Sequence, residues 1–283
     1  MKLKIQARAK INWTLDVVGT LPNGYHDLDM LMQSVTLCDQ MTMEEAPQLS
    51  LYVRAQGRAF VPADGNNLVL KAAAALQAAT GCTRGARITL KKYIPVAAGM
   101  GGGSSDAAAV LRALRTLYAP DISDGRLETL AARLGSDVPF FIRGGTQLAT
   151  GRGEVVSPLP QLAAGWFVVV KPDEGYSTAE MYRRLDEPGS MLVRNSRYMQ
   201  DAVAANNVHA VAVELHNSFE RVVPKDSSLR TIKDALRAQG ALGTLLSGSG
   251  SAVFGLFDDQ SAAAAAAEAL KKTWPWVFVA RPV

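Results

Sequence analysis

The residues best suited to chemistry lie in a glycine-rich segment, PVAAGMGGGSSDAAAVLRAL, at residues 95–114. Its glycines, at positions 99, 101, 102 and 103, leave the loop unobstructed by side chains. A helix is predicted directly after them, because apolar residues recur at helical spacing from Ala107 to Tyr118. Glycines can turn backbone N–H groups toward one point, and a helix N-terminus adds unpaired donors and partial positive charge. The segment therefore predicts an anion cradle, whose usual occupant is a polyphosphate.

Two better-known phosphate motifs do not fit this segment. A Walker loop, GxxxxGK followed by serine or threonine, requires a lysine after its last glycine, and none is present. A dinucleotide fingerprint, GxGxxG, would require glycine where the chain has Ser104. A flexible loop capped by serine is the alternative interpretation. The glycines, the two serines and an acidic residue ahead of one helix favour phosphate binding.

Asp106 places a negative charge close to this cradle, and two roles are open to it. The carboxylate, or a neighbouring serine hydroxyl, is the type of ligand that helps to hold Mg²⁺ between phosphates. An acidic residue at this position is equally expected as a helix N-cap or as a residue of the first turn. The sequence does not decide between the two roles.

Asp137 is the second acidic candidate. It lies in the segment GSDVPFF, residues 135–141, where an unpaired carboxylate among apolar residues would be costly. A carboxylate within hydrogen-bond reach of a substrate hydroxyl can accept its proton, so Asp137 is a candidate base. The alternative is an N-cap for a helix that begins at Val138, and the two roles are compatible.

Lys10 and Asn12 share one face of a predicted strand, because strand side chains alternate between faces. Lys10 interrupts an apolar stretch between Ala9 and Ile11. A lone lysine is most often solvated, so the residue type alone assigns it no role.

The elements that position these residues follow from the apolar pattern. Alternation from Leu3 to Ala7 and a second run over residues 11–18 predict strands. A helix is predicted over residues 68–80, between an Asx-rich start and Gly81. A serine-glycine turn at residues 247–251 joins two predicted strands. Further elements are expected over residues 28–35, 49–53, 87–92, 127–134, 166–170, 177–185, 226–238, 242–246, 252–257 and 277–280, with Ser261 capping an alanine-rich helix. This mixture predicts an α+β protein.

Composition excludes several classes of protein. The chain has 283 residues, which is long enough for two domains, and its 30 basic and 26 acidic residues give a net charge of +4. These charges are scattered, so an anionic small molecule fits better than nucleic acid. The N-terminus does not resemble a signal peptide, and no apolar run reaches the ~20 residues of a membrane span. We expect a cytoplasmic protein without a membrane partner, with Cys38 and Cys82 as thiols.

Three segments, in order, resemble the motifs of the GHMP kinases, the family of galactokinase, homoserine kinase and mevalonate kinase. AKINWTLDVVGTLPNGYHDLDML resembles the first motif, PVAAGMGGGSSDAA the second, and LSGSGSAVFGLF, at residues 246–257, the third. Within the family, AKIN, GYH and GSDVPFF are most similar to enzymes whose substrate carries a cytidine diphosphate group. The resemblance covers nearly the full chain.

The resemblance implies a two-lobed α+β fold with an active site in the cleft between the lobes. The N-terminal lobe, residues 1–158, would bind ATP and resemble domain 2 of ribosomal protein S5. The C-terminal lobe, residues 159–283, would be ferredoxin-like. ATP and Mg²⁺ are the implied cofactors, and no residue is assigned as a metal ligand. The implied partner is a small molecule carrying a cytidine diphosphate group, bound to a monomer or a weak homodimer.

The resemblance also implies direct phosphoryl transfer from ATP to a substrate hydroxyl. Asp137 would act as the base, and Lys10 would keep it ionised and lower the pKa of the hydroxyl. Asn67 and Lys92 would contribute to the adenosine pocket, although a helix cap and a solvated strand end are the respective alternatives. The serine-glycine turn would pack beside the phosphate loop. The loop residues expected to bind ATP are Pro95, Val96, Ala97, Ala98, Gly99, Met100, Gly101, Gly102, Gly103, Ser104 and Ser105.

Substrate contacts are implied for four residues. Asn12 would contact the substrate near Lys10. Tyr25 and His26 would stack on a cytosine and hydrogen-bond to it, and Tyr176 would close the base from the other side. Two alternatives are another small-molecule kinase of the mevalonate or homoserine type, whose substrate has no base to stack, and a nucleotide-binding protein that transfers no phosphate.

Overall fold

The computed structural model describes residues 2–55, 61–186 and 196–283. The chain divides into two compact units, the first formed by residues 1–9, 37–96 and 101–144 and the second by residues 10–36, 97–100 and 145–283. The strands β1 (Lys2–Thr20) and β2 (His26–Ala46) each contribute residues to both units. The expected division into residues 1–158 and 159–283 is a single cut along the chain and stays a prediction.

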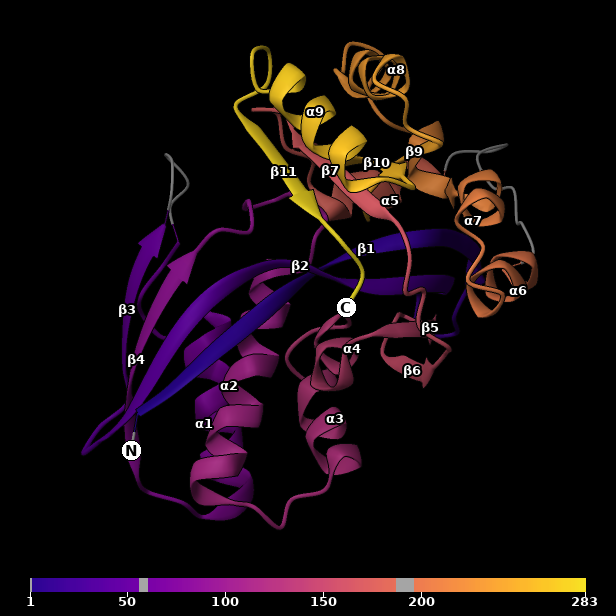
Figure 1. The fold of residues 1–283 in the computed structure, drawn as a ribbon. Helices are drawn as coiled ribbons and strands as arrows, with labels where there is room; N and C mark the ends of the chain where they lie inside the picture. Colours follow the sequence, from indigo (N-terminus) through magenta and orange to yellow (C-terminus); the bar gives the residue numbers. More distant parts are fainter. Residues whose placement is uncertain (1, 56–60, 187–195) are drawn as a thin grey trace. The chain divides into compact units, whose positions relative to one another are not determined.

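The first unit combines strands with a set of helices (Figure 1). Strand β4 (Gly85–Lys92) pairs antiparallel with the second half of β2 and parallel with β3 (Ser50–Ala55). The side chain of Asn67 accepts a hydrogen bond from Val69 N at the start of the first helix, and Gly81 ends it with a φ of 69°. The predicted start and stop of this helix are therefore confirmed. The helices of this unit are α1 (Leu68–Thr80), α2 (Gly102–Tyr118), α3 (Asp124–Ala132) and α4 (Val138–Arg143).

The second unit contains a four-stranded antiparallel sheet in the order β11-β7-β10-β9. Its strands are β7 (Trp166–Lys171), β9 (Gly243–Leu246), β10 (Val253–Phe257) and β11 (Trp276–Ala280). Helices α8 (Leu229–Ala238) and α9 (Gln260–Leu270) pack on this sheet, as Figure 1 shows. The predicted strand pair around the serine-glycine turn is confirmed as β9 and β10.

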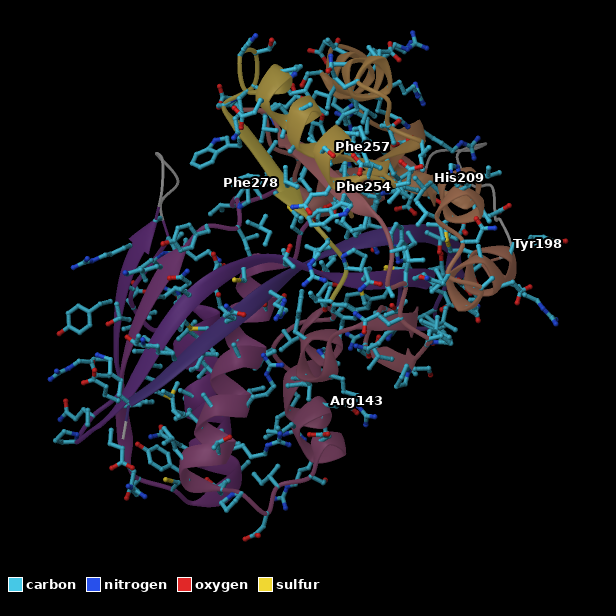
Figure 2. All side chains as sticks on the ribbon, viewed as in Figure 1. Arg143, Tyr198, His209, Phe254, Phe257 and Phe278 are labelled. Atoms are coloured by element: carbon cyan, nitrogen blue, oxygen red, sulfur yellow. The ribbon has the colours of Figure 1, made fainter. Side chains whose placement is uncertain are left out.

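Strand β1 supplies both a core face and a polar face to the second unit. The buried ring of Trp13 lies 5.2 Å from Phe167 and 6.4 Å from Phe254, whose position on β10 is labelled in Figure 2. Because side chains alternate along a strand, Lys10 and Asn12 point to the face opposite Trp13. Packing the aromatic side chains thus fixes the direction of the polar ones.

The remaining elements of the second unit surround these strands. Strands β5 and β6 form a hairpin that pairs with the first half of β2, and the short strand β8 pairs parallel with β1. The elements are β5 (Thr146–Gly151), β6 (Val155–Pro158), β8 (His216–Asn217), α5 (Thr178–Leu185), α6 (Arg197–Ala204), α7 (Val208–Glu214) and the 3₁₀ helix η1 (Ser218–Arg221).

Some local predictions need correction. The two runs predicted near the N-terminus form one continuous strand of 19 residues, because no turn residue interrupts the run between them. Asp259 rather than Ser261 caps α9, since its carboxylate accepts the N–H of Ala262, while Ser261 lies in the first turn. The helix marked by Leu127 ends at Ala132, before the predicted stop.

Two further expectations concern cysteines and membranes. Cys38 and Cys82 are free thiols, as expected. Among the helices that the structure describes, none combines the length and apolar character needed to span a bilayer.

Candidate functional site

The glycine loop leads directly into the N-terminus of α2. Gly101 precedes the helix with a φ of 68°, and no side chain caps this end. Gly99 also has a positive φ, 72°, a conformation that favours glycine. The hydroxyl of Ser105 donates to the carbonyl of Arg8 at 2.6 Å, which ties the first turn to β1 within the first unit. An uncapped helix end behind glycines is the arrangement expected of an anion cradle.

The serine-glycine turn packs beside the glycine loop, as expected. A Cβ added to Gly99 would lie 1.9 Å from the carbonyl oxygen of Ser247, so no side chain fits there. The hydroxyl of Ser247 donates to the carbonyl of Gly99 at 3.1 Å, and Ala252 N donates to Ala98 O at 3.2 Å. The turn therefore fixes the path of residues 98–99.

Lys10 lies beside both of these segments. Its backbone N–H donates to the carbonyl of Met100 at 3.1 Å, and its Nζ donates to Asn12 Oδ1 at 2.6 Å. A Cβ on Gly248 would lie 3.2 Å from Lys10 Nζ. The side chain is buried, with Lys10 only 3% exposed, so the interpretation as a solvated lysine is wrong. Burial of an ammonium group is costly, so Lys10 is held in place by specific interactions rather than by water.

Asp137 immediately precedes α4 and is half-buried. It occupies the N-cap position of α4, as the alternative interpretation predicts, but its side chain makes no capping hydrogen bond. Asp137 belongs to the first unit and Lys10 to the second. The pairing of the two that the resemblance implies stays a prediction.

A buried ion network lies beneath the start of α2 in the first unit. Lys92 Nζ donates to the carboxylate of Asp39 and to Asp106 Oδ2, the latter at 2.7 Å. A Cβ on Gly102 would lie 3.2 Å from Lys92 Nζ, which places the ammonium under the helix N-terminus. Lys92 is therefore no solvated strand end, and Asp106, the fifth residue of its helix, is no cap.

Asp39 is a member of this network that the sequence analysis missed. Its Oδ1 accepts the N–H groups of Tyr93 at 2.5 Å and Ile94 at 2.8 Å, so it also fixes the turn that leads into the glycine loop. Its only sequence signal was an acidic residue following the apolar segment at residues 28–35. The network thus connects the turn that precedes the glycine loop with Asp106 in the helix that follows it.

The charges of this network are strongly perturbed. Burial raises the pKa of Asp106 to about 8, because loss of solvation and the nearby Asp39 outweigh the attraction of Lys92. Burial alone would lower the pKa of Lys92, but the two carboxylates raise it. Asp106 Oδ1 is buried and has no hydrogen-bond partner among the described residues. In all the residues that the structure describes, no group of three or more His, Cys, Asp or Glu residues is arranged to hold a metal ion.

Asn67 lies at the first turn of α1, and its alternative role as a helix cap is confirmed. Its Oδ1 accepts the N–H of Val69 at 2.9 Å and its Nδ2 donates to Pro62 O at 2.6 Å. Leu68, the next residue, would be 3.7 Å from a Cβ on Gly103. This brings α1 close to the glycine loop, and a contact of Asn67 with adenosine stays a prediction.

His26 belongs to an aromatic cluster in the second unit. Its ring stacks on Tyr182 of α5, with centroids 4.5 Å apart and an interplanar angle of 21°. Its Nε2 lies 2.7 Å from Asp186 Oδ1. Tyr25 is 56% exposed, and the guanidinium of Arg152 lies 5.0 Å from its ring centroid. Exposed aromatic faces beside a histidine suit a planar base.

Tyr182 and Asp186 were missed by the sequence analysis. Helical spacing predicts only that one face of residues 177–185 is buried, and it gives no partner for Tyr182. Tyr176, which was expected beside the base, has its ring at 2.7 Å from a Cβ placed on Gly250 and donates its hydroxyl to Glu174 at 2.7 Å. Its closure over a base stays a prediction.

Comparison with known families agrees with the sequence motifs. The model of the GHMP kinases N terminal domain matches residues 67–145, and the model of the GHMP kinases C terminal matches residues 199–275. A relative from Symbiobacterium thermophilum, named 4-diphosphocytidyl-2-C-methyl-D-erythritol kinase, is 43% identical over 92% of this chain and 92% of its own.

Solved structures extend the comparison to the fold. A crystal structure of 4-(cytidine 5'-diphospho)-2C-methyl-D-erythritol kinase is 34% identical, with a TM-score of 0.83, and covers 99% of this chain and 100% of that chain. The homoserine kinase of Cytophaga hutchinsonii is 19% identical, with a TM-score of 0.75, over 99% of this chain and 95% of that chain. The second likeness concerns the fold alone.

The perturbed carboxyl of Asp106 predicts a specific pH dependence of stability. Its pKa rises from 3.8 to about 8 on folding, so the folded state binds the proton more tightly than the unfolded state. The stabilisation is complete below about pH 4 and is lost as the pH rises through about 8. Relative to Asp106→Asn, the unfolding free energy of the wild type should therefore fall between these values, by at most about 1.4 kcal/mol per pH unit. Urea unfolding of both proteins across this range measures the difference, and parallel pH profiles would contradict the assignment.

Proposed function

The chain belongs to the 4-diphosphocytidyl-2-C-methyl-D-erythritol kinases of the GHMP kinase family, and from this premise we propose how its residues act. The reaction transfers the γ-phosphoryl group of ATP to the 2-hydroxyl of 4-diphosphocytidyl-2-C-methyl-D-erythritol. The products are the 2-phosphate and ADP, in the non-mevalonate pathway of isoprenoid synthesis. The observation that carries the proposal is the position of buried Lys10 beside the glycine loop, through its hydrogen bond to Met100.

ATP is held by the glycine loop and the N-terminus of α2. Residues 99–103 allow backbone N–H groups to approach the phosphates, and the helix end adds its partial positive charge. The buried ammonium of Lys92 lies beneath Gly102, where the carboxylate of Asp39 offsets its charge. Asn67, at the start of α1, and Lys92, at the end of β4, contribute to the pocket for adenosine in this proposal.

The acceptor of the phosphoryl group is a tertiary hydroxyl, which is weakly acidic. Asp137 accepts its proton as transfer proceeds, and Lys10 keeps Asp137 ionised and lowers the pKa of the hydroxyl. Asn12 orients Lys10 through its hydrogen bond and faces the substrate from the same side of β1. The phosphoryl group passes directly to the oxygen, without a phosphoenzyme.

Mg²⁺ would bind together with the phosphates of ATP. Asp106 offers one buried oxygen without a partner, but its other oxygen is paired with Lys92 and its raised pKa favours the protonated form. Asp106 therefore fits poorly as a ligand, and the phosphates and water would hold the ion. When bound, Mg²⁺ neutralises charge on the β- and γ-phosphates.

The cytosine of the substrate binds at the aromatic cluster around His26. Tyr25 and Tyr182 provide aromatic rings, and the imidazole provides its Nδ1 for the base edge, since Nε2 is occupied by Asp186. Asp186 fixes the orientation of the imidazole through Nε2. This cluster is what separates the chain from kinases whose substrates lack a base.

The setting of the enzyme follows the sequence predictions. We propose a cytoplasmic monomer or weak homodimer whose partners are small molecules. The scattered charges and the small net charge of +4 support the absence of a nucleic-acid partner.

A coupled assay of ADP release tests the activity. With Mg-ATP, ADP should form with 4-diphosphocytidyl-2-C-methyl-D-erythritol and not with mevalonate, homoserine, galactose or water alone, because only the first offers a base to the His26 cluster. Turnover with another acceptor would overturn the substrate assignment. ATP binding without any turnover would favour a non-catalytic nucleotide-binding protein.

The base assignment is tested by Asp137→Asn. The amide cannot accept the hydroxyl proton, so kcat should fall by about 10²- to 10⁴-fold, while ATP affinity stays within a few-fold. Asp121→Asn, the same change at an exposed turn, serves as the control and should leave kcat unaltered. Near-normal turnover of Asp137→Asn would exclude Asp137 as the base.

A further inference from the structure

Alternate residues from Glu174 to Thr178 contact the serine-glycine turn. The carbonyl of Glu174 accepts a hydrogen bond from the hydroxyl of Ser251, and Thr178 Oγ1 lies 2.9 Å from Ser249 Oγ. Between them, the ring of Tyr176 would be 2.7 Å from a Cβ on Gly250. Residues 174–178, here called the turn support, therefore follow one side of the turn.

Other contacts of the same turn involve the catalytic groups. A Cβ on Gly248 would lie 2.8 Å from Gly99 O and 3.2 Å from Lys10 Nζ. Asn217 Nδ2 donates to the carbonyl oxygens of Gly248 and Leu246, each at 2.8 Å. The turn thus lies between the turn support and the segment that carries Gly99 and Lys10. A displacement of the turn would therefore change the surroundings of both Gly99 and Lys10.

Glu174 holds the ring of Tyr176 in one position. Its Oε1 accepts the Tyr176 hydroxyl at 2.7 Å and the N–H of Ser228 at 3.0 Å. Lys171 Nζ donates to the carbonyl of Glu174 at 2.7 Å and fixes its backbone. Burial and the hydrogen bond to Glu174 raise the pKa of the Tyr176 phenol, so the hydroxyl remains a donor at neutral pH. The ring is anchored at its far end as well as packed on Gly250.

We propose that Tyr176 is a positioning residue that holds the serine-glycine turn against Gly99 and Lys10, rather than a wall of the cytosine pocket. The inference rests on the proposed function, since it assigns Gly99 to the phosphates of ATP and Lys10 to the transfer step. Among the described residues, the aromatic ring that stacks on the imidazole of His26 is that of Tyr182. Tyr176 therefore affects ATP binding and phosphoryl transfer, and Tyr182 affects binding of the cytosine base.

Steady-state kinetics with ATP and the cytidylyl acceptor varied separately distinguish the two roles. Tyr176→Leu removes the ring, so kcat should fall and the KM for ATP should rise, each by about tenfold or more, with the KM for the acceptor within twofold. Tyr176→Phe keeps the ring on Gly250 and should restore most of the lost activity. Tyr182→Leu is the matched control, and it should raise the KM for the acceptor by about tenfold without changing that for ATP.

Two results would overturn the proposal. One is a Tyr176→Leu enzyme in which the KM for the acceptor rises and that for ATP does not, which would return Tyr176 to the cytosine pocket. The other is a lowered melting temperature with kcat and both KM values unchanged, which would make Tyr176 merely structural. If Tyr176→Leu does not fold, Thr178→Val provides the same test, because it removes the hydroxyl contact with Ser249. It should shift kcat and the KM for ATP in the same direction but less.

A failure of the proposed function can be distinguished from a failure of the positioning role of Tyr176. A wild-type protein that does not phosphorylate the cytidylyl acceptor would refute that function without testing Tyr176. In that case calorimetric titration with Mg-ATP still decides the inference. Tyr176→Leu should bind ATP about tenfold more weakly than the wild type, and Tyr182→Leu should bind it equally well. Equal ATP affinity of wild type and Tyr176→Leu would reject the positioning role.

Discussion

The structure of the site depends on a close approach of two stretches of backbone, the glycine loop at Gly99 and the serine-glycine turn at Ser247 and Gly248. Neither glycine can carry a side chain. A Cβ on Gly99 would lie 1.9 Å from Ser247 O, and a Cβ on Gly248 would lie 2.8 Å from Gly99 O. Backbone packed this tightly cannot shift independently. Lys10, bonded to Met100, takes its position from the same contact.

Each unit also holds buried polar groups, and each of these groups is placed by an apolar neighbour or an opposite charge. Trp13 fills the core on one face of β1, so the polar side chains of Lys10 and Asn12 emerge on the other. In the first unit, Lys92 offsets the charge of Asp39 and donates a hydrogen bond to Asp106 beneath the start of α2. Burial of such groups is costly unless they are paired, so each arrangement favours a single geometry of the loop. The same low-polarity surroundings strengthen their effect on a bound phosphate.

Local signals predicted much of this molecule, and contacts between distant residues account for what they missed. Asn67 and Gly81 bound α1 because capping and left-handed glycine are properties of the chain near them. The glycine loop and the serine-glycine turn were recognised from their composition for the same reason. Asp39 and Tyr182 were not, since their partners, Lys92 and His26, come from other elements that are distant in the sequence, and no spacing rule joins them. The discontinuous units were also beyond prediction, because β1 and β2 each pass through both.

The most direct test of this account is ATP binding by Gly99→Ala. A methyl group at this position meets the carbonyl of Ser247, in a backbone conformation that L-residues rarely adopt, whereas Gly125→Ala in α3 meets nothing within 4 Å. Calorimetric titration with Mg-ATP should show at least about a tenfold loss of affinity for Gly99→Ala and none for Gly125→Ala. Equal affinity of Gly99→Ala and wild type would contradict the claim that the contact between loop and turn shapes the nucleotide site.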